Sequence, residues 1–132
     1  MKAVVERAWE DRSLLDQTET RQAVADVMQG LDEGKLRVAE PLGDGEWQVN
    51  EWVKQAVLLN FPIQSMQTIE VGPFEFHDKM PLKKGYAKAG VRVVPHALVR
   101  YGAHVGKDCI LMPSYVNLGA FVGERTMVDT WA

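Results

Sequence analysis

The 132-residue sequence predicts an α+β protein, in which a small helical N-terminal domain is followed by short repeated strands. Two spacings lead to this fold class. Apolar residues recur at helical intervals in the first sixty residues and at intervals of six in the last forty. The composition, 46% apolar and 25% charged, is that of a folded globular domain and excludes disordered and disulfide-dense scaffolds.

Residues 1–62 are expected to form a compact cap domain that opens with two amphipathic helices. Apolar positions at helical spacing place these helices over Val4–Trp9 and Thr20–Leu31. Thr20 has a side chain suited to capping the N-terminus of the second helix.

A hairpin and a third helix complete the predicted cap domain. Strands are expected over Lys35–Glu40 and Glu46–Val49, joined by a tight turn at Gly43–Gly45. The third helix should begin after Asn50, and Pro62 should prevent its continuation.

Residues 63–92 are expected to be a linker, because proline and glycine interrupt every periodic pattern there. At most one strand is predicted in this stretch. It also contains a small group of lysines, which could meet an anionic ligand but which we interpret as solvated surface: Lys79, Lys83, Lys84 and Lys88.

A six-residue repeat runs through residues 93–132. Seven consecutive units begin with an aliphatic residue, and six of them carry a small residue in the fifth place. The unit from Leu111 to Tyr115 is one residue short. The leading residues are Val93, Val99, Val105, Leu111, Val116, Val122 and Val128.

This repeat is typical of a parallel β-helix, in which three short strands form one triangular turn and the aliphatic leaders stack inside. We predict that residues 93–132 are the start of a left-handed parallel β-helix, although parallel crossovers are nearly always right-handed. A small β-sandwich is the structural alternative, but its strands would alternate and be separated by turn clusters.

Three stretches of the chain resemble tetrahydrodipicolinate N-succinyltransferases, a family of hexapeptide-repeat acyltransferases. They read GVRVVP at Gly90–Pro95, LMPSYVN at Leu111–Asn117 and MVDTWA at Met127–Ala132. The cap domain is similar as well, in LRVAE at Leu36–Glu40 and WVKQAVLL at Trp52–Leu59.

The resemblance implies an enzyme that moves a succinyl group from succinyl-CoA to the amino group of hydrated, ring-opened tetrahydrodipicolinate, in diaminopimelate and lysine biosynthesis. It implies a homotrimer with active sites between subunits, succinyl-CoA as cosubstrate and no permanently bound cofactor. A second catalytic acid and most coenzyme A contacts of the family follow the position of Ala132, so we expect this chain alone to be inactive.

Two residues of the matching motifs correspond to site residues of the family. Arg92 corresponds to the arginine that contacts the substrate, and a guanidinium suits a dicarboxylate because its planar fork matches a carboxylate. Asp129 corresponds to the catalytic and substrate-binding aspartate, which can accept a proton from the attacking amine. On residue type alone, Arg92 could be a surface residue and Asp129 a turn former.

Two other functions remain open. The repeat could be a non-catalytic oligomerisation module, because a short prism exposes an apolar end. A zinc enzyme similar to gamma-class carbonic anhydrases is less favoured: its three histidine ligands would have to come from His77, His96 and His104, and the spacing is unlike that class.

Charge and hydropathy bear on partners and location. The net charge is −3, and no long basic run is present, so nucleic acid is not an expected partner. No apolar stretch approaches the ~20 residues of a membrane span, and we expect a cytoplasmic protein without membrane contact. The single Cys109 is expected to be a buried apolar residue.

Overall fold

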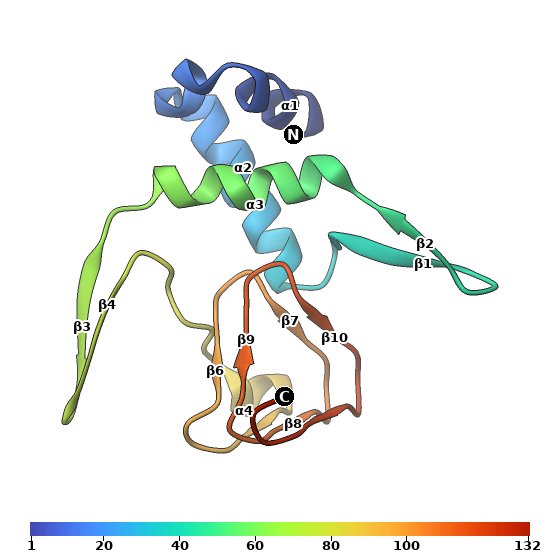
Figure 1. Cartoon of the computed structure of the whole chain (residues 1–132), viewed down its shortest axis with the longest axis vertical. Helices are drawn as coiled ribbons and strands as arrows, with labels where there is room; N and C mark the ends of the chain where they lie inside the picture. The colour runs from blue at the N-terminus through green and yellow to red at the C-terminus, as the bar shows by residue number, and fades with distance from the viewer.

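The computed structural model describes residues 1–132 and shows an α+β arrangement of helices above and stacked strands below (Figure 1). Three α-helices and one short 3₁₀ helix form the helical part, which begins the chain. They are α1 (Lys2–Glu10), η1 (Arg12–Asp16), α2 (Thr18–Asp32) and α3 (Glu51–Ile63).

The helices confirm the apolar spacing of the sequence, but their ends differ from the prediction. Thr20 does not cap α2; it is buried within the helix, and the cap position is Gln17. Asn50 precedes α3 as predicted, yet its side chain does not cap the helix and donates instead to the Arg37 carbonyl oxygen at 2.9 Å. Pro62 lies inside the last turn of α3.

Two antiparallel hairpins project on opposite sides of α3 (Figure 1). The first joins β1 (Ala39–Gly43) to β2 (Glu46–Val49), so its first strand starts later than the predicted Lys35. The second joins β3 (Gln67–Val71) to β4 (Phe74–Asp78), where we expected at most one strand. The predicted number of strands was wrong here, because the pattern of alternating side chains is short and interrupted by glycine and proline.

Seven two-residue strands follow the short helix α4 (Tyr86–Ala89) and pair in parallel, each with the strand three further along. β5, β8 and β11 form one sheet, β6 and β9 a second, and β7 and β10 a third. We call residues 91–132 the stacked-strand region. Its strands are β5 (Arg92–Val93), β6 (Leu98–Val99), β7 (His104–Val105), β8 (Ile110–Leu111), β9 (Tyr115–Val116), β10 (Phe121–Val122) and β11 (Met127–Val128).

Every predicted leader of the six-residue repeat is the second residue of one of these strands. The leaders in the middle of the region are almost fully buried, and Leu111 is completely so. The single five-residue step falls between β8 and β9, where Leu111 and Val116 still stack in phase with the turn before them. Parallel pairing argues against the sandwich, whose sheets are antiparallel.

Two separate groups of buried side chains hold the molecule together. One lies among the helices and includes Val27, Leu59 and Met80. The other lies inside the stacked-strand region and includes Leu111 and Cys109, which is 1% exposed as predicted. No helix is both long and apolar enough to cross a bilayer.

A buried ion pair joins these two parts. Lys83 Nζ lies 2.8 Å from Asp32 Oδ1 at the end of α2, and the same carboxylate oxygen accepts a 2.9 Å hydrogen bond from the Gly102 N–H in the stacked-strand region. The Lys83 side chain is only 10% exposed. The expectation that all four linker lysines are solvated was therefore wrong for Lys83, because its partner lies 51 residues away.

Two glycines allow this close approach of helix and strands. Gly34 has a φ of +75°, and a Cβ there would lie 2.6 Å from His104 Nδ1. Gly102 has a φ of +92°, and a Cβ there would meet the Met28 methyl group. A larger residue at either place would strain the backbone and displace the side chain that it meets, His104 or Met28.

The core of the stacked-strand region gives a first prediction. Leu111→Ala should lower the free energy of unfolding by about 2–5 kcal/mol, because Leu111 is fully enclosed and its removal leaves a cavity. Urea unfolding followed by circular dichroism would measure this. Met127→Ala, at a side chain that is 60% exposed, is the control, and an equal loss in both variants would contradict the assignment of Leu111 to the core.

The ion pair gives a second prediction. Lys83→Met should cost about 3 kcal/mol of stability, because it leaves the Asp32 carboxylate largely buried without its cation. The double variant Asp32→Leu, Lys83→Met should recover much of that loss in the same urea experiment. Lys84→Met, at the exposed neighbouring lysine, should have almost no effect.

Candidate functional site

The three motif stretches lie on one another at a single corner of the stacked-strand region. The Val94 N–H donates to the Leu111 carbonyl oxygen at 2.9 Å, and the Met112 N–H donates to that of Val128 at 2.9 Å. The Trp131 N–H continues the ladder to the Pro113 carbonyl oxygen at 2.7 Å. Segments far apart in the sequence thus form one layered surface, which we call the motif corner.

Some residues of LMPSYVN shape this corner, and others face solvent. Ser114 is buried, and its hydroxyl donates to the Met112 carbonyl oxygen at 2.7 Å, which closes the turn. Asn117 accepts a 2.9 Å hydrogen bond from the Leu118 N–H. Tyr115 is half exposed and leaves its ring available beside the corner.

Arg92 and Asp129 lie on the same three-stranded sheet but are not in contact. Arg92 is exposed in β5 and is in register with Ile110 of β8, which is in register with Met127 of β11. Asp129 directly follows β11. Strand β11 lies two strand spacings, or about 10 Å, from β5, which carries Arg92. No hydrogen bond or ion pair joins the two side chains, and strand β8 lies between them.

Asp129 forms a turn and also presents a free carboxylate oxygen. Its Oδ1 accepts a 2.7 Å hydrogen bond from the Thr130 N–H, and its main-chain oxygen accepts one from the Ala132 N–H at 3.1 Å. The turn-forming role weighed from the sequence is therefore real. The exposed side chain remains able to accept a proton or a hydrogen bond from an amine.

Arg100 is a charged residue near the corner that sequence reasoning did not single out. Its guanidinium donates to Asp78 Oδ2 at 2.9 Å and to Asn117 Oδ1 at 3.3 Å, linking the end of β4 to the LMPSYVN motif. The sequence did contain a signal for the contact between Arg100 and Asn117. Arg100 directly follows the leader Val99, just as Asn117 directly follows the leader Val116.

The pKa of the Asp78 carboxyl is lowered by this arrangement. Burial alone would raise the pKa, but the N–H groups of Lys79 and Met80 and the charge of Arg100 together outweigh it. The folded protein therefore favours the carboxylate form of Asp78.

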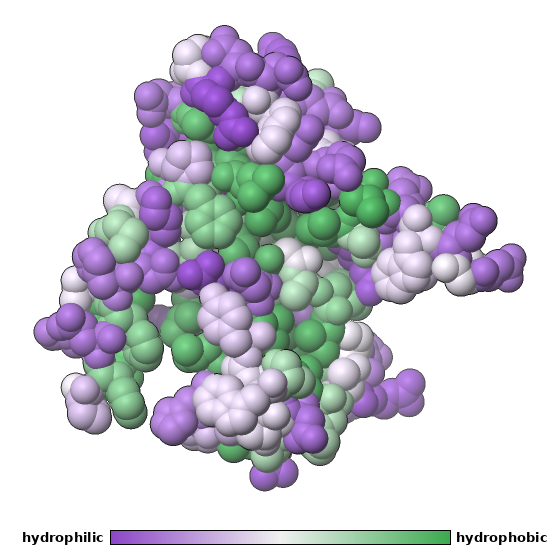
Figure 2. Space-filling model, in the orientation of Figure 1, coloured by the Kyte–Doolittle hydropathy of each residue, from purple (hydrophilic) through white to green (hydrophobic).

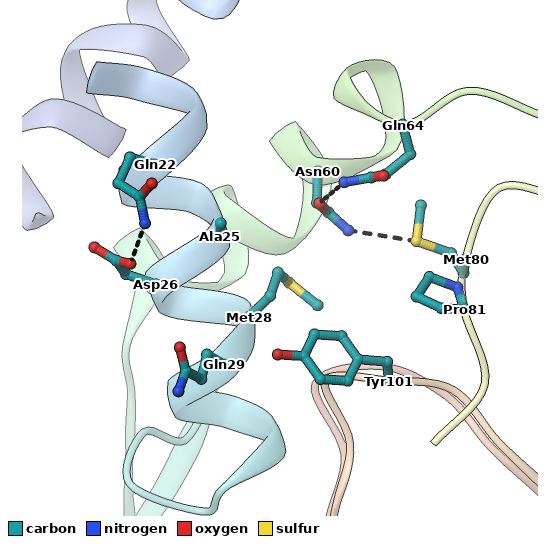
Figure 3. A pocket seen from close by; sticks show the side chains of 10 residues that line it. All are labelled: Gln22, Ala25, Asp26, Met28, Gln29, Asn60, Gln64, Met80, Pro81 and Tyr101. Atoms are coloured by element: carbon teal, nitrogen blue, oxygen red, sulfur yellow. Dashed lines mark hydrogen bonds between the residues drawn. The ribbon is translucent and has the colours of Figure 1, made fainter. Parts of the chain in front are cut away.

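A cavity of about 220 Å³ lies between α2, α3 and the stacked-strand region (Figure 3). Asn60 Nδ2 donates to Met80 Sδ at 3.4 Å, and Gln64 Nε2 donates to Asn60 Oδ1 at 3.1 Å. Tyr101 points its hydroxyl toward Met28 (Figure 3), and burial, followed by the charges of Asp32 and Glu33, raises the pKa of its phenol. None of the lining residues belongs to the motif corner.

The three histidines do not come together. His77 bonds to Thr68 in the second hairpin, His96 packs against Phe74, and His104 stacks on Phe121 beside the end of α2. No group of three histidine, cysteine or acidic side chains is placed to hold a metal ion.

Comparison with known proteins identifies the motifs. Residues 1–63 match the family model described as tetrahydrodipicolinate N-succinyltransferase N-terminal. Over 99% of its length, the chain is 46% identical to a 2,3,4,5-tetrahydropyridine-2,6-dicarboxylate N-succinyltransferase of Polynucleobacter asymbioticus, of which it covers 52%. Over nearly its whole length, the chain is thus similar to tetrahydrodipicolinate N-succinyltransferases.

Further members of the family give the same match. An enzyme of the same name from Acinetobacter baylyi is 46% identical over the whole of this chain and 52% of its own length. One from Xylella fastidiosa is 51% identical over 85% of this chain and 43% of its own length. The chain spans about half the length of the tetrahydrodipicolinate N-succinyltransferases that it matches, and the likeness extends through the motif corner.

The ion pair of Asp78 and Arg100 gives a prediction for pH. Because the folded pKa of Asp78 is lowered, its contribution to stability is full above the unfolded pKa of about 3.8 and is lost as the pH falls through the folded pKa. Asp78→Asn should therefore lower the free energy of unfolding at pH 7, by less than about 1 kcal/mol at this partly exposed site, and have a smaller effect below pH ~3.5.

The control for that measurement is Asp44→Asn at the tip of the first hairpin, where the carboxylate makes no ion pair. A difference between wild type and Asp78→Asn that stays constant from pH 7 to pH ~3 would contradict the assigned role of the charge.

Proposed function

We propose that this chain forms part of an N-succinyltransferase acting on tetrahydrodipicolinate, in diaminopimelate and lysine biosynthesis. The acceptor is the hydrated, ring-opened form of the substrate, and succinyl-CoA is the donor. The supporting observation is that all three motif stretches meet at one corner, beside an arginine and a carboxylate that face open space. The family relatives carry this activity in their names.

The fold that supports this function is a left-handed parallel β-helix in residues 93–132, preceded by the cap domain in residues 1–62 and a linker in residues 63–92. Three sheets of parallel two-residue strands and an interior of aliphatic leaders favour this fold. The two separate groups of buried side chains favour the division into domains, although Met80 of the linker packs with the helices.

In this proposal, Arg92 binds a carboxylate of the acceptor. Its guanidinium is exposed on β5 and is not engaged in any ion pair within the chain. A bidentate contact would orient the dicarboxylate along the sheet, with its amine directed toward the third strand.

The Asp129 carboxylate then accepts the proton that the attacking amine loses. The amine nitrogen attacks the thioester carbonyl carbon, the carbon–sulfur bond breaks, an amide forms, and the proton lost from nitrogen passes to the carboxylate and on to the coenzyme A thiolate. The hydrogen bond from the Thr130 N–H holds one carboxylate oxygen in place and leaves the other to face the amine.

The remaining expectations concern assembly. We propose a cytoplasmic homotrimer with sites at the seams between subunits, where a second acid and the coenzyme A contacts complete the chemistry. No permanently bound cofactor is required by an acyl transfer of this kind. The competing function is a non-catalytic oligomerisation module, which the exposed Met127 and Trp131 at the last turn favour.

Coenzyme A release from succinyl-CoA, with an aminopimelate acceptor, tests the proposal. The chain alone should be inactive, whereas a chimera that continues from Ala132 into the C-terminal half of the Acinetobacter baylyi relative should be active. In that chimera Asp129→Asn should lower kcat about 100-fold or more with the assembly intact.

Asp108→Asn is the matched control, because Asp108 is another exposed aspartate at a turn of the stacked-strand region. Unchanged turnover in Asp129→Asn would remove that residue from the mechanism. An inactive chimera that folds and assembles correctly would favour the oligomerisation module.

A further inference from the structure

The second hairpin is an arm whose two faces differ. In the register of β3 and β4, Ile69 lies opposite Phe76 and Val71 opposite Phe74, which places these four apolar side chains on one face. Thr68, Glu70, Glu75 and His77 take the other face. Val71, Phe74 and Phe76 are 55%, 52% and 38% exposed, so the apolar face lacks a full partner within the chain.

The arm runs down beside the stacked-strand region (Figure 1) and contacts it at two points. At the tip, the Phe74 and His96 rings meet edge to face at 5.9 Å, and at the base Asp78 pairs with Arg100. Between these points lies a slot of about 130 Å³, visible as a hollow beneath the arm in Figure 2. Its apolar walls are Ile69, Phe76, Met80, Leu82, Leu98 and Tyr115, and the paired Asp78 and Arg100 complete the lining.

Unlike the arm, the first hairpin projects freely from the other side of α3 (Figure 1). In its register Trp47 lies opposite Pro41 and Val49 opposite Ala39, so that one face is again apolar. Trp47 is 61% exposed and Val49 is 53% exposed. A protruding indole with nothing packed upon it is the kind of side chain that anchors an interface.

Charge distinguishes the two surfaces. Residues 38–52, which include the first hairpin, contain four acidic residues and no basic one. Around the slot, Arg100 pairs with Asp78, and Lys79 and Lys84 line the adjoining hollow, so three cations stand against one acid there. Opposite charges of this kind bring two surfaces together and fix their register.

We propose that the first hairpin of one copy of this chain docks into the slot beneath the arm of a second copy, with Trp47 as its anchor. The apolar walls receive the indole, and the Arg100 guanidinium in the slot provides a cation for its ring. The acidic residues Asp44 and Glu46 then face the basic segment that contains Lys84. The contact is heterologous, because hairpin and slot are different surfaces of the same chain.

Cysteine cross-linking tests this pairing. Trp47→Cys and Phe76→Cys, unfolded together in urea and refolded as a mixture, should form a two-chain disulfide roughly ten-fold more than either variant alone. Native Cys109 is buried in the folded chain, so the urea step is carried out with a reductant, and oxidation begins only after refolding. Gln48→Cys with His77→Cys is the matched control, since each residue is the sequence neighbour on the opposite face of its hairpin.

Replacing Trp47 by cysteine weakens the proposed anchor. A second measurement therefore uses chains without introduced cysteines and follows their self-association by sedimentation. Trp47→Arg should weaken self-association about ten-fold or more, while Gln48→Arg should leave it unchanged, with the fold monitored by circular dichroism. High salt should also weaken the association.

Three outcomes would overturn the proposal. The mixture could cross-link no better than the control pair, Trp47→Cys could cross-link equally well alone, or Trp47→Arg could associate as the wild type does. The second would show a symmetric contact between first hairpins instead of a hairpin in a slot.

Discussion

The buried ion pair of Lys83 and Asp32 fixes how the two halves of this molecule are placed. The pair joins the C-terminal end of α2 to the segment that leads into the stacked strands, and the Gly102 N–H adds a hydrogen bond from the strands themselves. A buried charge pair gains little net stability over apolar packing, but it tolerates few geometries. It therefore chiefly aligns the end of α2 with the Lys83 segment and with Gly102 of the stacked strands.

The fold could be predicted where the sequence is periodic. The leaders of the repeat require no knowledge of distant contacts, because each is buried by its own counterpart one turn away, and all seven are found in strands. The five-residue step between Leu111 and Val116 was visible for the same reason. The helices followed from apolar spacing, although Thr20 shows that a good capping residue can be buried in a helix when tertiary packing requires it.

The parts that could not be predicted depend on contacts between distant segments. Nothing near Lys83 in the sequence indicates that Asp32 will neutralise it, and the arm of β3 and β4 is too short for its alternation to stand out among prolines and glycines. At the candidate site the motif residues Arg92 and Asp129 could be named from resemblance, and three strands per turn place their units on one side, but their individual contacts could not be predicted. Arg100 was missed because its partners, Asp78 and Asn117, come from two different elements.

The uneven distribution of charge along the chain has a consequence for encounter with small molecules. A net charge of −3 describes the molecule only from far away, at distances where the individual charges are averaged. Close to the surface, within a Debye length of about 8–10 Å, exposed cations act individually, and Lys84, Lys88, Arg92 and Lys107 are exposed without an ion-pair partner in the chain. Anionic metabolites would be drawn by diffusion to the face that carries Arg92, so an acidic protein can still capture acidic compounds.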